Sequence, residues 1–339
     1  MADVAAKKKR SEPSVPIVVS GTRPTGALHL GHLNGALKNW IELQATARCY
    51  FFVADWHALT TDYANPSGIR ENTHEMILDW LAVGLDPGKA VIFRQSEVPE
   101  HAELHLLFSM IIPVPWLERV PTYKEQQEQL EGRDLSTYGF LGYPLLQAAD
   151  ILMYKAGAVP VGEDQLPHVE LTREVARRFN RLYGDVFPEP KGLVVEAARV
   201  PGTDGRKMSK SYGNAVSLTD DADAVYNKLV RMVTDPRRQR RTDPGDPKDC
   251  PAFRLHEIYC TSEERAELAE GCRSASIGCV DCKKVMIRHV QAELAPIQER
   301  RRELSTRPGV VKDVLTDGRR RAAEAAEETM TEVRAGMGL

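Results

Sequence analysis

The sequence predicts an α/β domain built on a parallel sheet, followed by a mainly helical region. Over the first two hundred residues, short apolar runs of strand length alternate with segments of helical periodicity. From about Thr219 the strand-like runs disappear, and long charged segments with helical spacing take their place. The first pattern favours a sheet covered by helices on both faces, and the second favours a separate helical unit.

The elements of the α/β part can be placed in order. The first strand is Ile17–Ser20 (IVVS), an apolar run that ends at Gly21. An amphipathic helix follows, because apolar residues recur at helical spacing. They are Leu30, Leu33, Leu37, Trp40 and Ile41. Cys49–Ala54 (CYFFVA) is a second buried strand, Glu71–Ala82 is a helix, and Val91–Phe93 (VIF) is a third strand.

The second part of the chain reads as helices only, in the segments Glu263–Glu270, Val285–Leu304 and Val311–Met337. We expect four units, and the last helices of the fourth unit are candidates for packing back on the α/β domain. The units are a flexible tail (1–14), an α/β domain (15–200), a lysine-containing loop (201–218) and a helical region (219–339).

Composition narrows the class of protein. The 339 residues carry a formal net charge of only −3, so no global positive field points to nucleic acid. The basic runs Arg237–Arg241 and Arg319–Arg321 are more simply solvated faces. No stretch approaches the roughly 20 apolar residues that span a bilayer, and the N-terminus lacks the apolar core of a signal peptide. We therefore expect a cytoplasmic protein with reduced thiols and no membrane span.

The turn after the first strand has features that suit a nucleotide phosphate. Small residues at Gly21, Thr25 and Gly26 let the backbone approach a ligand, and the start of a helix offers free N–H groups. His29 and His32 are three residues apart, so both lie on one side of the first helical turn. A zinc half-site or a surface accident would also explain them. Neither a P-loop nor a dinucleotide fingerprint is present.

A second candidate motif lies in the loop Gly202–Asn214 (GTDGRKMSKSYGN). Its two lysines, Lys207 and Lys210, are flexible point charges that can follow a pyrophosphate as it separates. Taken alone, the loop also fits an exposed basic surface segment.

Together the two motifs, HLGH (His29–His32) and KMSKS (Lys207–Ser211), resemble the two signatures of the class I aminoacyl-tRNA synthetases. From about residue 17 to 339 the chain is similar to the bacterial tryptophanyl-tRNA synthetases, notably at Phe51–Thr61, Tyr143–Ala156 and Val159–Asn180.

This resemblance implies a Rossmann-like catalytic domain, a helical anticodon-binding domain and a homodimer. It also implies a reaction in which Mg²⁺ and ATP activate L-tryptophan for transfer to the 3′ end of tRNA(Trp). A tyrosyl-tRNA synthetase, a catalytically silent relative that binds tRNA or protein, and a nucleotidylyltransferase are the alternatives.

The amino-acid pocket is predicted on one helix face, where Tyr143, Gln147 and Asp150 are spaced four and three residues apart. A buried carboxylate needs a partner, and an indole N–H, which can only donate, would satisfy Asp150. Backbone amides would satisfy it equally well. The resemblance places Asp150 on the indole nitrogen, Tyr143 and Gln165 on the substrate ammonium, and His57 beside the pocket. Gln147 stands where many tryptophanyl enzymes have Met.

The resemblance also implies an ATP site. His29, His32, Lys207 and Lys210 are its expected catalytic residues, since they would stabilise charge on the departing pyrophosphate. The expected ATP-binding residues are Arg23, Pro24, Thr25, Gly31, His32, Gly162, Glu163, Asp164, Lys207, Met208, Ser209, Lys210 and Ser211. Lys124 is a further candidate for a phosphate contact.

Half of the six cysteines lie in Gly271–Cys282 (GCRSASIGCVDC). With Cys250, the residues Cys272, Cys279 and Cys282 form the pattern C-x21-C-x6-C-x2-C, which suits zinc or an iron–sulfur cluster. Cys260 is the odd one out, although it could replace Cys250, and Cys49 reads as a small core residue. Buried free thiols without a metal are the simpler alternative. Resemblance to the bacterial tryptophanyl enzymes that carry such a motif favours a [4Fe–4S] cluster over zinc.

Overall fold

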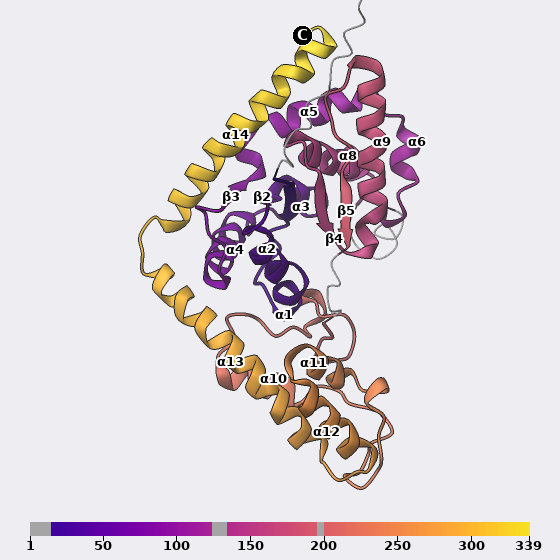
Figure 1. Cartoon of the computed structure of the whole chain (residues 1–339), viewed down its shortest axis with the longest axis vertical. Coiled ribbons are helices and arrows are strands. Elements are labelled where there is room, and N and C mark those ends of the chain that lie inside the picture. The colour runs from indigo at the N-terminus through magenta and orange to yellow at the C-terminus, as the bar shows by residue number, and fades with distance from the viewer. Residues whose placement is uncertain (1–14, 124–133, 195–199) are drawn as a thin grey trace, which may run out of the picture.

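The structure of the protein is a computed structural model that describes residues 15–123, 134–194 and 200–339. Its centre is a five-stranded sheet in the order β3-β2-β1-β4-β5, with every neighbouring pair parallel. The strands are β1 (Ile17–Thr22), β2 (Arg48–Val53), β3 (Ala90–Arg94), β4 (Ala158–Val161) and β5 (Lys191–Val194). The predicted α/β fold with a parallel, Rossmann-like sheet is confirmed (Figure 1).

Three strands lie where the sequence predicted them, but β4 and β5 were not predicted. Each has only four residues, and β4 contains Pro160. β5 is largely exposed and contains Gly192, so it has no apolar run from which a strand could be recognised. Pairing with β4 at the edge of the sheet determines its conformation.

The helix after β1 has a local irregularity. It begins as α1 (Leu30–His32), widens into the π-helical segment η1 (Leu33–Leu37) and continues as α2 (Lys38–Leu43). The predicted apolar face is buried, and Trp40 stacks on Phe51 of β2 with 4.4 Å between ring centroids. π-Helical turns are rare and occur often at functional sites.

Helices cover both faces of the sheet (Figure 1). They are α3 (Asp55–Asp62), α4 (Ile69–Val83), α5 (Glu100–Ser109), α6 (Val114–Glu118), α8 (Tyr138–Met153) and α9 (Leu166–Tyr183). Alternate strand residues enter two separate cores, as the two-residue period of a strand requires. Val18 and Phe51 belong to the core that contains α4 residues, whereas Val19 and Phe52 belong to the core that contains α5 and α8 residues.

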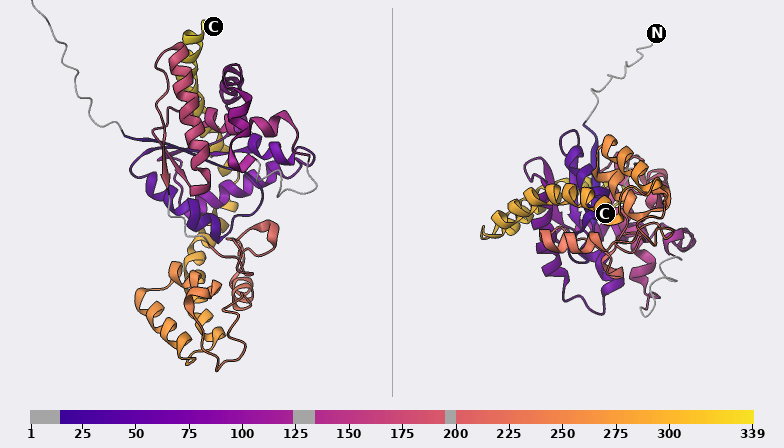
Figure 2. Two further views of the ribbon diagram at one scale, coloured as in Figure 1. Left: turned by 90° about the vertical axis from the view of Figure 1, so that its right-hand side faces the viewer. Right: turned by 90° about the horizontal axis from the view of Figure 1, so that it is seen from below.

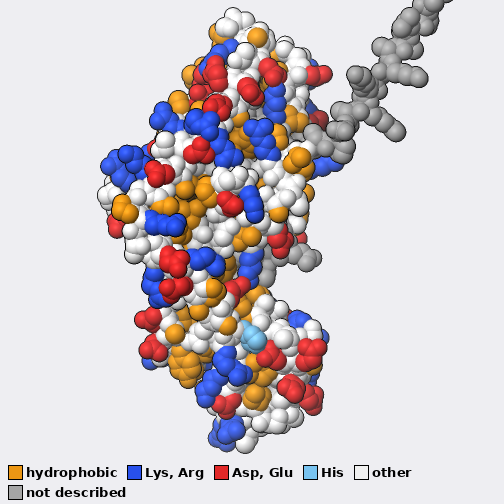
Figure 3. All heavy atoms as spheres, turned by 60° about the vertical axis from the view of Figure 1, so that its left-hand side comes forward, with side chains coloured by type: hydrophobic (Ala, Val, Ile, Leu, Met, Phe, Trp, Pro, Cys, Tyr) orange, Lys and Arg blue, Asp and Glu red, His pale blue; other side chains and the backbone are white. Residues whose placement is uncertain are grey.

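The C-terminal part is helical, as predicted, and forms a lobe below the sheet domain (Figures 1 and 2). Its elements are α10 (Ala222–Val230), α11 (Pro251–Tyr259), α12 (Ser262–Arg273), α13 (Cys279–Ser305) and α14 (Val310–Met337). On the face drawn in Figure 3, acidic and basic side chains are interspersed over both parts, without an area of a single sign.

The last helix leaves this lobe and runs along the sheet domain (Figure 1). Gly318 of α14 lies directly on β3, since a Cβ atom there would be 1.7 Å from the carbonyl oxygen of Ile92. Ala322, Ala326 and Met330 continue this contact and are fully buried. Small residues therefore let α14 approach the strand closely.

Candidate active site

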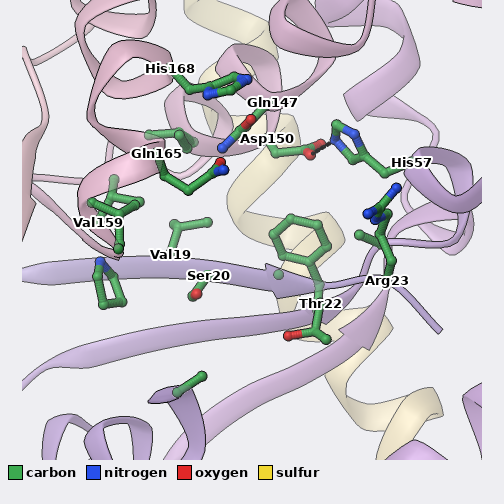
Figure 4. Close-up of a pocket in the computed structure, with 18 of the residues that line it drawn as sticks. Val19, Ser20, Thr22, Arg23, His57, Gln147, Asp150, Val159, Gln165 and His168 are labelled. Carbon is green, nitrogen blue, oxygen red and sulfur yellow. Dashed lines mark hydrogen bonds and ion pairs between the residues drawn. The ribbon is translucent and has the colours of Figure 1, made fainter. Parts of the chain in front are cut away.

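A cavity of about 360 Å³ lies at the carboxyl ends of the central strands, where ligands bind in open α/β sheets. Its volume is in the range of small-molecule sites. The five residues expected to contact tryptophan all line it, and they are His57, Tyr143, Gln147, Asp150 and Gln165. Figure 4 shows their side chains, except that of Tyr143, together with Arg23 from the end of β1.

Asp150 is the buried charge of this cavity, with 1% of its surface exposed. Its carboxylate accepts hydrogen bonds from His57 Nε2 at 2.8 Å and from His101 Nδ1 at 2.7 Å. Gln95 Nε2 donates to both carboxylate oxygens, at 2.8 and 2.9 Å. Burial raises the pKa of Asp150, but the hydrogen bonds from His101 and His57 outweigh it and hold the pKa at about 2. The carboxylate is therefore charged at neutral pH, and side chains rather than backbone amides satisfy it.

Sequence reasoning missed Gln95 and His101. His101 also lies 2.7 Å from the hydroxyl of Tyr154, so it links Asp150 of α8 to the residue that directly follows this helix. Gln95 could have been found, because it follows β3 at the carboxyl end of a strand, the position from which polar residues reach a ligand. No local signal marks His101, whose neighbours along the chain form an ordinary helix.

Tyr143 belongs to a second network in the same cavity. Its hydroxyl lies 3.0 Å from Thr122 Oγ1 and 3.3 Å from His168 Nε2, and Thr122 is 3.1 Å from the same nitrogen. Burial lowers the pKa of His168 to about 4, with a smaller effect from His57. His168 is therefore neutral at pH 7, and its Nε2 can accept a hydrogen bond from the Tyr143 hydroxyl. The lone pairs of the tyrosine oxygen then remain available to accept a hydrogen bond from a ligand. Neither Thr122 nor His168 was predicted.

The two histidines of HLGH cap the first turn of α1. Nδ1 of His29 accepts from the backbone N–H of Gly31, and Nδ1 of His32 accepts from the N–H of His29, both at 3.1 Å. The pKa of His29 is lowered to about 4, mainly by burial and also by Lys207, and that of His32 is lowered to about 3 by burial, His29 and Lys207. Since a neutral imidazole has one donor and one acceptor, each ring keeps its proton on Nε2. Both Nε2–H groups are available as donors.

The KMSKS loop lies against this turn. Met208 is buried, Lys207 and Lys210 are exposed, and Asn214 fixes the loop by accepting from the N–H of Ser209 at 2.8 Å. A Cβ on Gly26 would lie 2.0 Å from Nζ of Lys210, so this lysine reaches the loop before HLGH. The structure therefore brings the two motifs together.

The remaining candidates for ATP binding fall into two groups. Arg23, Pro24 and Thr25 follow β1, and Gly31 lies between the two histidines. Gly162 follows β4 and is followed by the short helix η3 (Glu163–Gln165), in which Glu163 and Asp164 are exposed. The backbone of Ser211 lies in η4 (Lys210–Tyr212), and Ser209 precedes it. Lys124 lies outside the described residues.

The four cysteines of the predicted motif line one small cavity between α11, α12 and α13, away from the tryptophan pocket. Arg238, His256 and Lys283 also line it, and Sγ of Cys282 is 3.5 Å from Nε2 of His256. The pKa of Cys282 is raised to about 12, mainly by burial and also by the nearby thiols. Cys260 is not among the lining residues, and Cys49 is buried in β2.

No helix in the described part of the chain is both long enough and apolar enough to cross a bilayer.

Comparison with known proteins agrees with this geometry. Residues 12–295 match the family described as tRNA synthetases class I (W and Y). The tryptophan–tRNA ligase of Thermotoga maritima is 55% identical, and the match covers 95% of this chain and 99% of that protein. The tryptophan–tRNA ligase of Ralstonia nicotianae is 48% identical, over 95% of this chain and 98% of that protein.

A solved structure is similar over the same range. The tryptophanyl-tRNA synthetase of Campylobacter jejuni, complexed with ADP and tryptophan, has a TM-score of 0.85 at 32% identity. The match covers 95% of this chain and all of that one. The relatives are named for tryptophan, which sets aside the tyrosyl and nucleotidylyltransferase alternatives. The chain therefore belongs to the class I tRNA synthetases of the tryptophan and tyrosine family, and within it to the tryptophan–tRNA ligases.

Proposed function

We propose that the 360 Å³ cavity binds L-tryptophan beside Mg²⁺-ATP and forms tryptophanyl-adenylate there. The tryptophan carboxylate attacks the α-phosphorus of ATP, and the bond to pyrophosphate breaks. A hydroxyl of the terminal ribose of tRNA(Trp) then attacks the acyl carbon and releases AMP. The substrate supplies the nucleophile of the first step, so alignment and charge stabilisation carry the catalysis.

The observation that carries this proposal is the buried, charged Asp150 in a cavity that is also lined by Gly35 and Ala36 of the helical segment directly after HLGH. An indole N–H can only donate, and Asp150 can only accept. A pocket built around this pair favours substrates that carry the donor, because an analogue without it makes no charge-assisted hydrogen bond to the buried carboxylate. Asp150 therefore selects the side chain of the substrate.

The other end of the cavity suits the substrate ammonium. When the hydroxyl of Tyr143 donates its hydrogen bond to His168 or Thr122, its oxygen can still accept a hydrogen bond from the substrate. Gln165 lines the same cavity and adds a second acceptor, its side-chain carbonyl. Gln147, one helical turn from both Tyr143 and Asp150, lies between the two ends and faces the ligand space (Figure 4).

The phosphates are assigned to the HLGH turn and the KMSKS loop. His29 and His32 donate from Nε2, and Lys207 and Lys210 supply mobile positive charge that follows the leaving pyrophosphate. Arg23 and the backbone of Pro24, Thr25 and Gly31 complete the phosphate side. The turn Gly162–Asp164 is assigned to the ATP ribose, and Mg²⁺ enters with ATP.

Tryptophan-dependent exchange of pyrophosphate into ATP is the direct test of this function, because it requires only the first step. We expect exchange with tryptophan and at least a thousandfold lower kcat/KM with tyrosine. Equal exchange with both amino acids would overturn the assignment of Asp150. Charging of tRNA(Trp) without exchange activity would overturn the mechanism.

We also propose that Cys250, Cys272, Cys279 and Cys282 hold a [4Fe–4S] cluster. A tetrahedral zinc site places its sulfur ligands about 3.8 Å apart. Among these four thiols, no three sulfur atoms all lie within 4.8 Å of one another, so they are too widely spaced for one zinc ion. Each thiol of a cluster binds a different iron, so wider spacing fits. Arg238 and Lys283 on the cavity wall suit the negative charge of a thiolate-bound cluster.

The cluster would have a structural role, since its cavity is separate from the tryptophan pocket. Anaerobic purification followed by iron, sulfide and zinc analysis tests this assignment. We expect about four irons and four sulfides per chain, lost in Cys272→Ser. A colourless protein with one zinc per chain would contradict it.

The remaining partners follow from the family. We propose that the helical region binds the anticodon of tRNA(Trp) and that two copies form a homodimer in the cytoplasm. Exposed apolar side chains at Leu106, Met110, Val114 and Tyr138 support self-association, because they lie on or beside the neighbouring helices α5, α6 and α8. Light scattering on Met110→Glu, with Tyr226→Glu on an exposed position of α10 in the helical lobe as control, tests the dimer.

A further inference from the structure

Three metal-binding side chains from separate places in the chain meet in the helical region. Cys260 ends α11, Glu264 lies in the first turn of α12, and His289 lies in the middle of α13. Their ligand atoms all lie within 4.8 Å of one another. Among the described residues, no other group of three or more His, Cys, Asp or Glu side chains has this spacing. None of the three belongs to the four-cysteine motif.

Two of these residues have ordinary structural contacts. Nε2 of His289 lies 2.8 and 3.0 Å from the two carboxylate oxygens of Glu264. Glu264 also accepts from the N–H of Thr261, as part of a capping box at the start of α12. The ion pair and the cap account for Glu264 and His289, but neither contact involves the thiol of Cys260. A bound cation would account for all three.

The ligand set is one that zinc prefers. Thiolate, imidazole and carboxylate bind zinc at about 2.3, 2.0 and 2.1 Å, so tetrahedral geometry places their ligand atoms about 3.3–3.6 Å apart. The observed separations reach this range with side-chain shifts of about 1 Å. Cys260 is 9% exposed, while the side chains of Glu264 and His289 are 31% and 35% exposed. The site thus has a buried thiol and an open side.

We propose that Cys260, Glu264 and His289 bind one Zn²⁺ ion, with water from the open side as the fourth ligand. On binding, the thiol loses its proton to solvent and the sulfur forms a bond to zinc, with no change in oxidation state. The ion ties the end of α11 to α12 and α13.

Titration of the thiol gives this site a pH dependence. The pKa of Cys260 is raised to about 11, mainly by burial and also by the Glu264 carboxylate, while Arg265 and Arg288 oppose the rise. Since zinc must displace the thiol proton, affinity rises with pH.

The location gives the ion a structural consequence. Tyr259 precedes Cys260, and its hydroxyl accepts from Asn34 Nδ2 at 2.7 Å. Asn34 lies in the π-helical segment directly after HLGH. The hydrogen bond between Asn34 and Tyr259 thus joins the helical lobe to the helix that carries HLGH. The ion would hold the end of α11 directly beside this hydrogen bond.

Cobalt titration of the full-length protein with its cysteine cluster loaded tests the proposal, because Co²⁺ bound to thiolate has a charge-transfer absorption band. We expect one Co²⁺ per chain with this band, displaced by Zn²⁺ and bound at least tenfold more weakly at pH 6 than at pH 8. His289→Gln and Cys260→Ser should each weaken binding at least tenfold, with iron and sulfide unchanged. Glu264→Gln should weaken it, whereas Glu263→Gln in the same helical turn and the exposed His74→Gln should not.

A band that persists in His289→Gln and Cys260→Ser, or that disappears only in Cys272→Ser, would overturn the proposal. The latter result would assign the cobalt to the four-cysteine cavity. If Cys260→Ser fails to fold, His289→Gln decides the matter, since its side chain is one-third exposed.

Discussion

Nζ of Lys210 in the KMSKS loop lies against the backbone of Gly26, in the turn that precedes HLGH. Gly26 has a φ of +124°, and a Cβ there would lie 2.0 Å from that nitrogen. The glycine therefore permits both the backbone conformation and the close approach of the lysine. The contact places the mobile charge of the loop at the turn to which the phosphates are assigned.

Replacing Lys210 by Ala should lower the kcat of pyrophosphate exchange about 100- to 1000-fold, because a charge that stabilises the leaving group is removed. Tryptophan affinity, measured by equilibrium fluorescence, should stay within twofold. Lys89→Ala, which removes an exposed lysine far from the site, is the matched control. Near-normal exchange in the Lys210 variant would refute its role as a clamp.

Asn214 should be required for the position of the whole loop. Its side chain accepts from Ser209 N–H and donates to Asp204 at 2.7 Å and to the carbonyl of Lys207 at 3.2 Å. Asn214→Ala should raise KM for ATP and lower kcat of exchange about tenfold each, with little change in Tm. Asn65→Ala at an exposed turn is the control. A large fall in Tm with unchanged kinetics in the remaining folded protein would show a purely structural role.

Asp150→Asn should weaken tryptophan binding about 10- to 100-fold, since a charge-assisted hydrogen bond is worth about 1.5–3 kcal/mol. The amide nitrogen of the new side chain would also face donors from His57, Gln95 and His101. ATP affinity should be retained, which calorimetry can measure. Asp86→Asn, where an exposed side chain caps a turn, is the isosteric control. Equal weakening of ATP and tryptophan would instead indicate collapse of the pocket.

The thermal stability of the protein should decrease as the pH is lowered from about 6.5 to 4. His29, His32 and His168 have folded-state pKa values lowered to about 4, 3 and 4, from 6.5. The unfolded chain therefore binds more protons in this window, and the folded state loses stability as pH falls through it. Asp150, with a pKa of about 2, adds a loss only at lower pH.

His168→Gln tests the source of this acid sensitivity, because a glutamine amide does not titrate. The fall in Tm between pH 7 and 4.5 should be smaller in this variant than in the parent chain. His74→Gln on the surface should leave the slope unchanged. Identical slopes in all three proteins would contradict the assignment to buried histidines.

Gly318→Ala should destabilise the protein by about 1–3 kcal/mol through overpacking, because the new methyl group would overlap the backbone of Ile92. Differential scanning fluorimetry should show a fall of several degrees in Tm. Gly139→Ala, in the first turns of α8 with no atom within 4 Å, should be neutral or slightly stabilising. Equal Tm values for the two variants would contradict close packing of α14 on β3.

Much of this arrangement could be predicted from local patterns. The strands at residues 17, 48 and 90 are continuous apolar runs, and the helices of the C-terminal region have strong periodicity. HLGH and KMSKS are contiguous segments whose chemistry is carried by neighbouring residues. The spacing of Tyr143, Gln147 and Asp150 correctly predicts one helix face that lines a pocket.

The sequence alone therefore determined the parallel sheet, the two motifs and the helix face, because each depends on residues within one or two turns or one strand. The tertiary structure decided which groups satisfy Asp150 and Tyr143. Gln95, His101 and His168 reach them from other elements, and no local periodicity encodes contacts between segments so far apart in the chain. Packing of α11, α12 and α13 likewise leaves Cys260 out of the cavity that the other four cysteines of the helical region line, and brings it to Glu264 and His289.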